Sequence, residues 1–502
     1  MNRHVVVIGG GPAGTAAAEA ALRHGATVTL VDANEALGGQ YNRRIPADYG
    51  VRRPLRIGHG YPAAERRARL LHEHPRCEYL ARAAVFHLER HPEGGCPTVR
   101  LLIGVEGERR IHREVRGDAL IIATGAYDRV CPFPGWDLPG VYTAGAAQTL
   151  VKTQRLLIGR SVLVSGTGPF LLPVAHSLAQ GGARVRAVLE ANPARRILRH
   201  WAARPWELRH SAGKAAELLE YASSGLRHRI PLRTSTAVVA VAGDGRVEEA
   251  TVARLDEHWS PIPGSHTTVA VDAVAVSHGF TPQLELAVAA GARLTAHGFV
   301  SVDQNQRTTV DSVWAAGELT GIGGAQVAAI EGTVAGIAAA GGDPSQERGL
   351  TARHRTAGQF VARLAGAHPI GAGATGWSRP DTVICRCENT TRAELTTTWT
   401  GVAGTSYRAA KLATRAGLGP CQGRICGSAI ADLRAAHWGA TADATHPRAA
   451  HAETADDSAP GGRCGTAGCT PAGLAAATPA ARPLAAIVRL RELAELDTQG
   501  PS

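Results

Sequence analysis

Residues 5–14 read VVVIGGGPAG, and an alanine-rich segment follows them as far as His24. The four apolar residues predict a buried strand and the glycines a tight turn. The segment that starts at Pro12 and Ala13 predicts a helix. A second apolar strand is expected at residues 27–31. This βαβ order predicts a doubly wound α/β domain built on a parallel sheet.

The glycines of this turn match the fingerprint of a dinucleotide site. Gly9 allows the tight turn, Gly11 lets the backbone approach a pyrophosphate, and Gly14 lets the helix pack closely on the strand. The start of the helix presents amide groups to the phosphates. Asp32 ends the second strand, where a carboxylate binds the ribose diol. The residues predicted to form this site are Gly9, Gly11, Pro12, Ala13, Gly14 and Asp32.

A second strand–turn–helix unit begins at Ser161 and reads SVLVSGTGPFLLPVA. Gly166 and Gly168 keep two glycines of the fingerprint, but Leu171 stands where the third would be. Leu171 is expected to push the helix away from the strand or to change its angle, so that a pyrophosphate fits less well. Glu190 ends the next strand and would favour NAD(H) over NADP(H). Two interpretations stay open: a functional nucleotide site, or a degenerate duplicate that binds nothing.

Three further segments favour FAD over NAD at the first site, because they resemble the two-dinucleotide-binding flavoprotein superfamily. The segment at 123–125 follows an apolar strand, and Glu318 follows the strand and glycine of VWAAG. In that superfamily the second segment contacts the ribityl chain and the pyrophosphate, with Asp more often at the position of Glu318. The GGQ loop at 38–40 resembles the loop beside the flavin. The resemblance adds Gly39, Gln40, Thr124, Gly125, Gly317 and Glu318 to the expected site.

Four of the nine cysteines form a C-x-C-x33-C-x4-C pattern near the C-terminal end. Four thiolates bind either a tetrahedral zinc ion or a 2Fe-2S cluster. The common zinc knuckle has C-x2–4-C at both ends, so the spacing favours 2Fe-2S. Cys464 and Cys469 repeat the C-x4-C spacing, which we interpret as coincidence. The predicted ligands are Cys385, Cys387, Cys421 and Cys426.

Composition excludes several classes of protein. Hydrophobic residues make up 44% of the chain and charged residues 19%, which predicts a packed core. The net charge of +11 comes from scattered arginines, and aromatic residues are only 4%, so we expect no nucleic-acid partner. The sequence has no uninterrupted stretch of 18 apolar residues, so we expect no membrane-spanning helix. The first strand leaves no room for a signal peptide, so the expected location is the cytoplasm, with docking at the inner face of the membrane left open.

The order of the motifs resembles one family over about residues 3–430. GGQY, ATGAYDRVCPFPGW, PGVYTAGAAQTL, GTGPFLLPVA, SHGFTPQLEL, AAGELTGIGGA, CRCE and GPCQGRIC occur in this order. They are similar to the α or A subunits of heteromeric, dye-linked amine dehydrogenases: opine oxidase, hydrogen cyanide synthase (its B subunit), and proline and hydroxyproline dehydrogenases. The resemblance implies FAD in the first domain and a BFD-like 2Fe-2S domain. It also implies a β subunit, an amine-oxidising flavoprotein, and an electron acceptor that is a quinone or a carrier protein.

The predicted fold class is α/β, with two Rossmann-like dinucleotide-binding domains in a glutathione-reductase-like arrangement and a small helical 2Fe-2S-binding domain. Two functions are retained: the electron-transfer subunit of an amino-acid or opine dehydrogenase, and a self-contained NADH-dependent reductase that feeds an acceptor protein. A non-enzymatic role in iron storage or sensing fits least, because the FAD motifs are intact. The amphipathic stretch from Leu484 to Leu496 predicts a helix, and an ordinary surface helix is favoured over one that docks on the body or on a partner. The expected boundaries are 1–150 and 290–345 for the FAD-binding domain, 151–289 for the second domain, 346–379 for a connector, 380–435 for the 2Fe-2S domain, 436–480 for a flexible linker and 481–502 for a tail.

Overall fold

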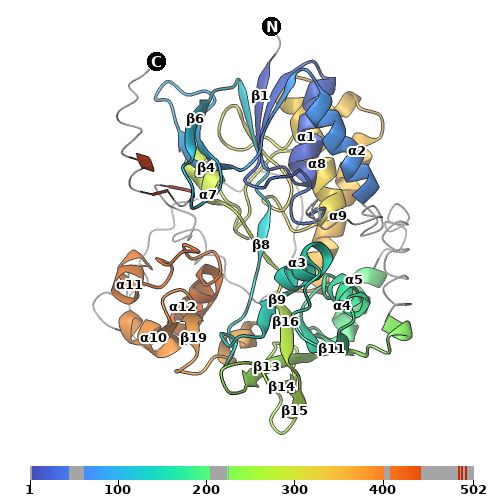
Figure 1. The fold of residues 1–502 in the computed structure, drawn as a ribbon, viewed down its shortest axis with the longest axis vertical. Helices are drawn as coiled ribbons and strands as arrows, with labels where there is room; N and C mark the ends of the chain where they lie inside the picture. The colour runs from blue at the N-terminus through green and yellow to red at the C-terminus, as the bar shows by residue number, and fades with distance from the viewer. Residues whose placement is uncertain are drawn as a thin grey trace.

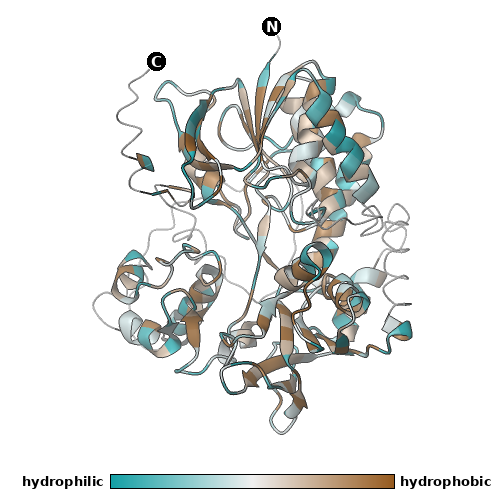
Figure 2. Cartoon of the chain, in the orientation of Figure 1, coloured by the Kyte–Doolittle hydropathy of each residue, from teal (hydrophilic) through white to brown (hydrophobic). Residues whose placement is uncertain are grey.

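The computed structural model describes residues 3–43, 61–203, 223, 225–400, 407–441, 484–486, 488–489 and 492–493. Two parallel five-stranded sheets each form the core of an α/β domain, and a small helical module lies beside them (Figure 1). Figure 2 shows apolar residues concentrated in the strands of both sheets and polar residues on the outer face of the helices. The predicted fold class, α/β with Rossmann-like domains, is confirmed.

The first domain is built on a sheet with the strand order β18-β7-β1-β2-β3. Successive residues of β1 point to opposite faces, so both faces are buried. Val5 and Val7 pack against the helices, whereas Val6 and Ile8 pack against an antiparallel sheet. The elements are β1 (His4–Ile8), α1 (Pro12–Arg23), β2 (Thr27–Val31), α2 (Tyr61–Glu73), β3 (Cys77–Leu80), β7 (Ala119–Ile122), β18 (Val313–Ala315) and α8 (Ala325–Ala339), with the antiparallel β4 (Ala83–Glu89), β5 (Thr98–Ile103) and β6 (Ile111–Val115).

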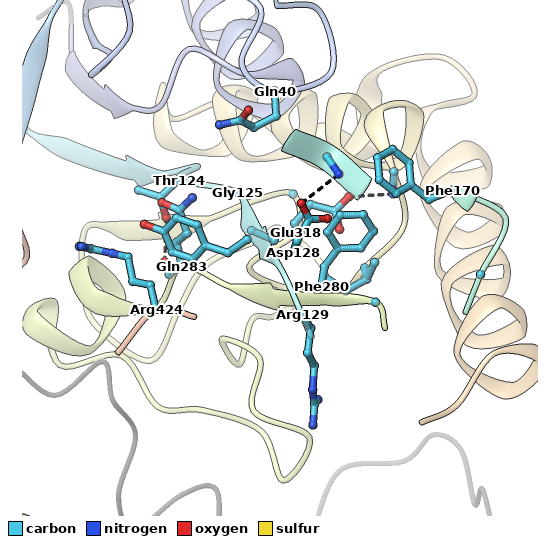
Figure 3. Close-up of a pocket in the computed structure, with 18 of the residues that line it drawn as sticks. Gln40, Thr124, Gly125, Asp128, Arg129, Phe170, Phe280, Gln283, Glu318 and Arg424 are labelled. Atoms are coloured by element: carbon cyan, nitrogen blue, oxygen red, sulfur yellow. Dashed lines mark hydrogen bonds between the residues drawn. The ribbon is translucent and has the colours of Figure 1, made fainter. Parts of the chain in front are cut away.

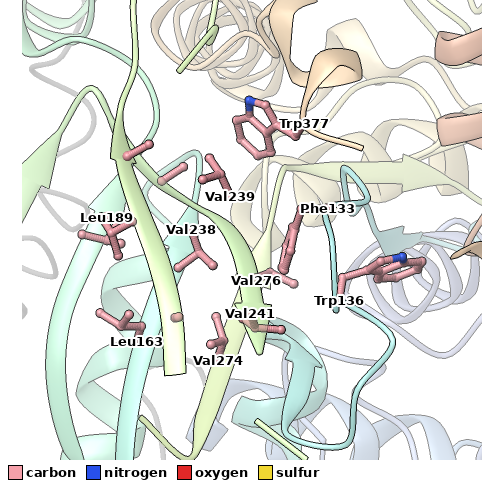
Figure 4. Packing of buried hydrophobic residues seen from close by; sticks show 14 of the residues in the cluster. Phe133, Trp136, Leu163, Leu189, Val238, Val239, Val241, Val274, Val276 and Trp377 are labelled. Carbon is pink, nitrogen blue, oxygen red and sulfur yellow. The ribbon is translucent and has the colours of Figure 1, made fainter. Parts of the chain in front are cut away.

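The second domain repeats this plan with the strand order β12-β11-β10-β16-β9. Figure 4 shows one face of its sheet, where Leu163, Leu189 and Val274 pack against Val238 of a second antiparallel sheet. The elements are β9 (Val141–Thr143), α3 (Ala144–Gln154), β10 (Ser161–Gly166), α4 (Leu171–Gln180), β11 (Arg184–Glu190), α5 (Ala194–Ala202), β12 (Leu232–Thr234), β13 (Thr236–Ala242), β14 (Glu249–Arg254), β15 (Thr267–Ala270) and β16 (Ala273–Ser277).

Two short antiparallel strands connect the domains. β8 (Ala126–Asp128) pairs with β17 (Phe280–Pro282). The chain then returns to the first domain through α7 (Glu285–Ala290), which packs against β4, and β18, which pairs with β7. β9 already pairs with β16, so the sheet of the second domain includes strand residues before the boundary expected at 150 and 151.

The cysteine module follows a connector that runs across the second domain. The connector contains η4 (Pro344–Gln346), α9 (Leu350–Ala367) and η5 (Ala372–Gly376). In the module, Ile384, Leu395, Trp399 and Ile430 are buried together in a core separate from those of the two sheets. Its elements are β19 (Val383–Cys385), β20 (Thr390–Thr391), α10 (Arg392–Thr400), α11 (Tyr407–Thr414) and α12 (Gly427–Thr441).

The end of the chain docks on the first domain, and here two expectations need correction. α12 continues to Thr441, past the expected start of the linker at 436. The expected helix from Leu484 is not formed at its start, because the backbone N–H of Ala485 donates to the Phe86 carbonyl of β4 at 2.7 Å. We call the described residues from 484 to 493 the C-terminal strap. The rest of the expected linker, with Cys464 and Cys469, lies outside the described residues.

Candidate functional site

A cavity of about 1960 Å³ lies where the two domains, the connector and the cysteine module meet. Both glycine-rich turns open into it. So do β8, which joins the domains, and residues of the connector, α12 and the C-terminal strap. Figure 3 shows Gln40, Thr124, Glu318 and Arg424 around the part of the cavity that the first domain forms.

The two inner glycines of the first turn have different surroundings. A Cβ on Gly14 would lie 1.7 Å from the carbonyl oxygen of Gly9, so this position tolerates no side chain. A Cβ on Gly11 would meet only Cα of Gly39, at 3.9 Å, so Gly11 faces open cavity. α1 starts directly after Gly11 and has no side-chain cap there. Its first amides therefore face the cavity as donors for an anion.

Asp32 lies at the end of β2 on the wall of the same cavity. One carboxylate oxygen, Oδ1, accepts hydrogen bonds from the backbone N–H of Asn34 at 2.7 Å and from its Nδ2 at 2.8 Å. Burial raises the pKa of Asp32 above its ordinary value, and the Asn34 bonds act against that rise. Asn34 therefore holds the carboxylate in place at the end of β2, where the sequence predicts a ribose-binding acid. The sequence analysis missed Asn34, although it stands two residues after the acid.

The two carboxylate oxygens of Glu318 differ in their hydrogen bonding. Oε1 accepts a hydrogen bond from the backbone N–H of Gly324 at 2.8 Å, whereas Oε2 is buried without a partner among the described residues. Burial raises the pKa of Glu318 to about 7. A buried carboxylate oxygen without a donor is costly. Since Glu318 lines the cavity, a ligand hydroxyl is the donor that would relieve this cost.

The other expected residues of the first site also line the cavity. Thr124 donates from Oγ1 to the carbonyl of Gln283 at 2.9 Å, which ties the end of β7 to the segment after β17. Gln40 accepts a hydrogen bond from Arg43 at 2.6 Å. The structure thus brings the expected residues together: Gly9, Gly11, Pro12, Ala13, Asp32, Gly39, Gln40, Thr124, Gly125, Gly317 and Glu318 line the cavity, and Gly14 packs beneath it.

Asp128 is a cavity residue that the sequence analysis missed. Its Oδ2 accepts a hydrogen bond from the backbone N–H of Gly145 at 3.1 Å, at the start of α3. Its Oδ1 is buried with no partner among the described residues, and burial raises the pKa of Asp128. The sequence could have indicated this residue, because an acid follows the ATG segment closely, on the strand that connects the first domain to the second.

The second glycine-rich turn differs from the first in the position of its helix. α1 starts one residue after Gly11, whereas α4 starts at Leu171, three residues after Gly168. Leu171 is buried in the core of the second domain. In place of a helix that starts directly after the glycine, Gly168 to Phe170 form a bend and a turn. This late start of α4 is the disturbance that accompanies Leu171. The helical amides that would bind a phosphate are withdrawn from the turn.

Glu190, the acid expected to bind a ribose, is already surrounded by donors from its own chain. Oε1 accepts hydrogen bonds from Thr167 Oγ1 at 2.9 Å and from the Asn192 backbone N–H at 2.9 Å. Oε2 accepts from the Gly168 backbone N–H at 2.8 Å, and Nδ1 of His368 lies 3.2 Å from it. Both Glu190 and His368 are nearly inaccessible to solvent. The connector therefore covers the side of Glu190 that a ribose would need.

The four cysteines of the C-terminal pattern lie close to one another and are all free thiols. The neighbouring Cys426 side chain lowers the pKa of Cys385 to about 6 and that of Cys421 to about 4. Cys421 also interacts with Cys387. Backbone N–H groups at Gly417, Gly423 and Ile425 bond to the sulfurs of Cys385 or Cys421. Over the described part of the chain, no three His, Cys, Asp or Glu side chains already stand in the geometry of a metal site.

The family model for pyridine nucleotide-disulphide oxidoreductases matches residues 3–332. The chain belongs to this family. Membership implies FAD and a nucleotide-binding fold, and the orphaned Glu318 oxygen and the open face of Gly11 suit such a ligand. The protein is therefore a flavin-dependent oxidoreductase. Among the helices of the described residues, none has the length and apolar character to cross a membrane.

Curated relatives narrow the family further. The flavoprotein is 33% identical to the HcnB subunit of hydrogen cyanide synthase from Pseudomonas aeruginosa, over 85% of this chain and 91% of the relative. It is 32% identical to the opine oxidase A subunit from Rhizobium meliloti strain 1021, over 86% and 92%. The resemblance to this group of subunits is confirmed. L-proline dehydrogenase from P. horikoshii shares the fold, with a TM-score of 0.57, 19% identity and coverage of 88% of this chain and 75% of that chain.

Proposed function

We propose that this flavoprotein is the electron-transfer subunit of a heteromeric amino-acid or opine dehydrogenase. A partner β subunit, itself a flavoprotein, oxidises the amine, and this chain passes the electrons to a quinone or a carrier protein. The protein works in the cytoplasm, or at the inner face of the membrane where the acceptor is a quinone. The observation that carries the proposal is the covered acid of the second site: Glu190 accepts hydrogen bonds from its own chain, and His368 Nδ1 lies 3.2 Å from its Oε2.

The covering of Glu190 bears on the choice between an electron-transfer subunit and an NADH-dependent reductase, because the two differ in the source of electrons. An NADH-dependent reductase needs a nucleotide site beside its flavin. Here the ribose acid has no free face, and α4 starts three residues after Gly168. We therefore infer that electrons enter from another protein. The relatives named above are subunits by name, which supports a partner for this chain as well.

The first site would hold FAD through the residues that the cavity collects. Gly11 and the first turn of α1 would face the pyrophosphate, Asp32 the adenosine ribose, and the free oxygen of Glu318 a hydroxyl of the ribityl chain. Bound FAD accepts electrons in pairs and releases them singly. The chain itself holds Asp32 through Asn34, and burial raises the pKa of Glu318 to about 7.

The four cysteines would hold a 2Fe-2S cluster. They supply four sulfur donors, and the amides at Gly417, Gly423 and Ile425 already bond to two of the sulfurs, as expected of groups that tune a cluster. Loading requires loss of the thiol protons, and the neighbouring Cys385 and Cys421 raise the pKa of Cys426. Cys387 is exposed, whereas Cys385 and Cys426 are buried, so the cluster would lie near the surface of the module.

An anaerobic optical titration with NADH tests the proposal. Flavin and iron–sulfur bands that are present but do not bleach on stoichiometric NADH support the electron-transfer subunit. Prompt bleaching of both bands would favour the second candidate, a self-contained NADH-dependent reductase. Protein purified without oxygen that shows no iron–sulfur band would contradict the cluster. Bleaching by a candidate amine only after addition of a β subunit would complete the test.

A further inference from the structure

The loop between Cys421 and Cys426 carries a charged side chain into the flavin cavity. Arg424 lies in the middle of this loop, and its guanidinium lines the cavity together with Thr124 and Tyr127. Figure 3 shows Arg424 on the side of the cavity where Thr124 and Gln283 lie. One residue thus belongs to the cysteine loop by its backbone and to the wall of the expected FAD site by its side chain.

Three contacts hold the Arg424 side chain in this position. Nε donates to Glu285 Oε1 of α7 at 2.9 Å, and Nη2 donates to the Ala485 carbonyl of the C-terminal strap at 2.6 Å. The centre of the guanidinium lies 5.7 Å from the centroid of the Tyr127 ring. The Arg424 and Glu285 side chains are only 18% and 9% exposed. Charges with so little exposure are weakly screened by solvent, so they act strongly on what binds beside them.

We propose that Arg424 is a positioning residue that links the cysteine loop to the redox potential of the bound flavin. The inference rests on the proposed FAD site. A cation at the cavity wall stabilises the reduced flavin, which carries more negative charge, and Glu285 opposes this effect. Because Arg424 belongs to the loop from Cys421 to Cys426, the conformation of this loop sets the position of the guanidinium relative to the flavin.

The test is the two-electron midpoint potential of bound FAD, measured against mediator dyes of known potential. The reduced dye gives two electrons and one proton to the flavin and is itself oxidised. Arg424→Gln is expected to lower the ratio of reduced to oxidised flavin about tenfold at a fixed potential, which is about 30 mV for a two-electron couple. Glu285→Gln is expected to shift the potential in the opposite direction, and Arg424→Lys to restore most of the wild-type value.

A matched control separates charge from docking. Arg129, which directly follows β8, and Asp432 of α12 form a second ion pair at 2.5 Å, and Arg129 points away from Thr124 and Gln283 in Figure 3. Arg129 and Asp432 both line the same cavity, so Asp432→Asn, which removes a contact of the module together with an acidic charge, is expected to raise the potential slightly, in the direction of Glu285→Gln and opposite to Arg424→Gln. Equal shifts of one sign in Arg424→Gln, Glu285→Gln and Asp432→Asn would overturn the inference and indicate a purely structural clamp.

The flavin spectrum keeps this test independent of the proposed function. Wild-type protein that retains no FAD would contradict the proposed function itself. FAD that binds with the same potential and the same visible circular dichroism in all variants would contradict only the role of Arg424. If Arg424→Gln does not fold, two other variants test the role of Arg424. Glu285→Gln should raise the potential, and Arg424→Lys should keep it near the wild-type value; failure of both would contradict the inference.

Discussion

The guanidinium of Arg110 donates to both carboxylate oxygens of Glu492, from Nε at 2.8 Å and from Nη2 at 2.7 Å. The two residues are 382 positions apart in the chain, and their side chains are 6% and 5% exposed. Arg110 directly precedes β6, so the pair fixes the C-terminal strap to the antiparallel sheet of the first domain. The same strap supplies the Ala485 carbonyl that holds Arg424.

Glu492→Gln is expected to release the strap, because it removes the negative charge that pairs with the buried Arg110. Loss of a buried pair costs up to 3–5 kcal/mol, and we expect about 1–3 kcal/mol here because the strap lies at the surface of the domain. Hydrogen exchange of the Ala485 amide measures this loss. Glu108→Gln, an exposed neighbour of Arg110, is the control. An Ala485 amide that exchanges equally slowly in Glu492→Gln would contradict the role of the pair.

The same pair predicts how the strap responds to acid. Arg110 lowers the pKa of Glu492 to about 2 from an ordinary value of 4.5. A lowered folded-state pKa gives stability that is present above pH 4.5 and is lost as the pH falls toward 2. Exchange at Ala485 is therefore expected to accelerate over that range once corrected for intrinsic rates. Glu492→Gln should show no such dependence.

Glu318 and Glu331 predict the opposite trend for the FAD-free protein. Burial raises the pKa of each to about 7. Because the folded-state pKa lies above the unfolded value, stability is fully present below about pH 4.5 and falls as the pH rises through 7. Glu318→Gln should remove about 2 kcal/mol of this decline between pH 5 and pH 8, as measured by urea unfolding. A decline that Glu318→Gln leaves unchanged would show that Glu318 ionises without penalty.

Gly11→Ala and Gly14→Ala separate FAD binding from folding. Gly11→Ala is expected to keep the stability of the FAD-free protein, because its Cβ meets only the Gly39 Cα at 3.9 Å, but to weaken FAD binding at least tenfold. Gly14→Ala is expected to unfold the domain, since its Cβ would lie 1.7 Å from the Gly9 oxygen. Thermal unfolding and equilibrium FAD titration distinguish the two. Normal FAD affinity in Gly11→Ala would contradict the expected pyrophosphate position.

His368→Ala is expected to uncover Glu190. With the imidazole gone from its position 3.2 Å from Oε2, one carboxylate oxygen becomes available to a ribose hydroxyl. We expect weak NADH binding to appear in the variant and to be absent in the wild-type protein, as measured by NADH fluorescence. His258→Ala, at an exposed position of the same domain, serves as the control. NADH that binds the wild-type protein as tightly as the variant would show that the connector does not close this site.

Cys387→Ser is expected to abolish the iron and acid-labile sulfide of protein prepared without oxygen, because one of four donors is lost. Cys77→Ser serves as the matched control: burial raises the pKa of the Cys77 thiol to about 11, and this residue lies in β3, outside the module. Full iron content in Cys387→Ser would contradict the ligand set, and iron loss in both variants would indicate a general loss of folding.

The sequence alone predicted the local units of the fold. β2, β7 and β10 occupy the expected strands because their apolar residues are buried between two layers. The glycines of the first turn could be recognised because their spacing forms a fingerprint within six residues, in which Gly14 packs on Gly9 and Gly11 faces the cavity. Leu171 indicated a disturbed second turn for the same reason, although not that α4 would start later.

The tertiary structure decided what surrounds these units. His368 stands against Glu190, Arg424 against Glu285, and Glu492 against Arg110. Each pair joins segments more than a hundred residues apart, so neither periodicity nor motif spacing records it. The end of the chain shows the same limit: its amphipathic pattern predicted a helix from Leu484, but Ala485 bonds to β4 outside any helix, and among the described residues of the strap only Glu492 and Leu493 are helical. Local sequence determines which elements can form, whereas long-range contacts determine which side chains pair and which sites remain accessible to a ligand.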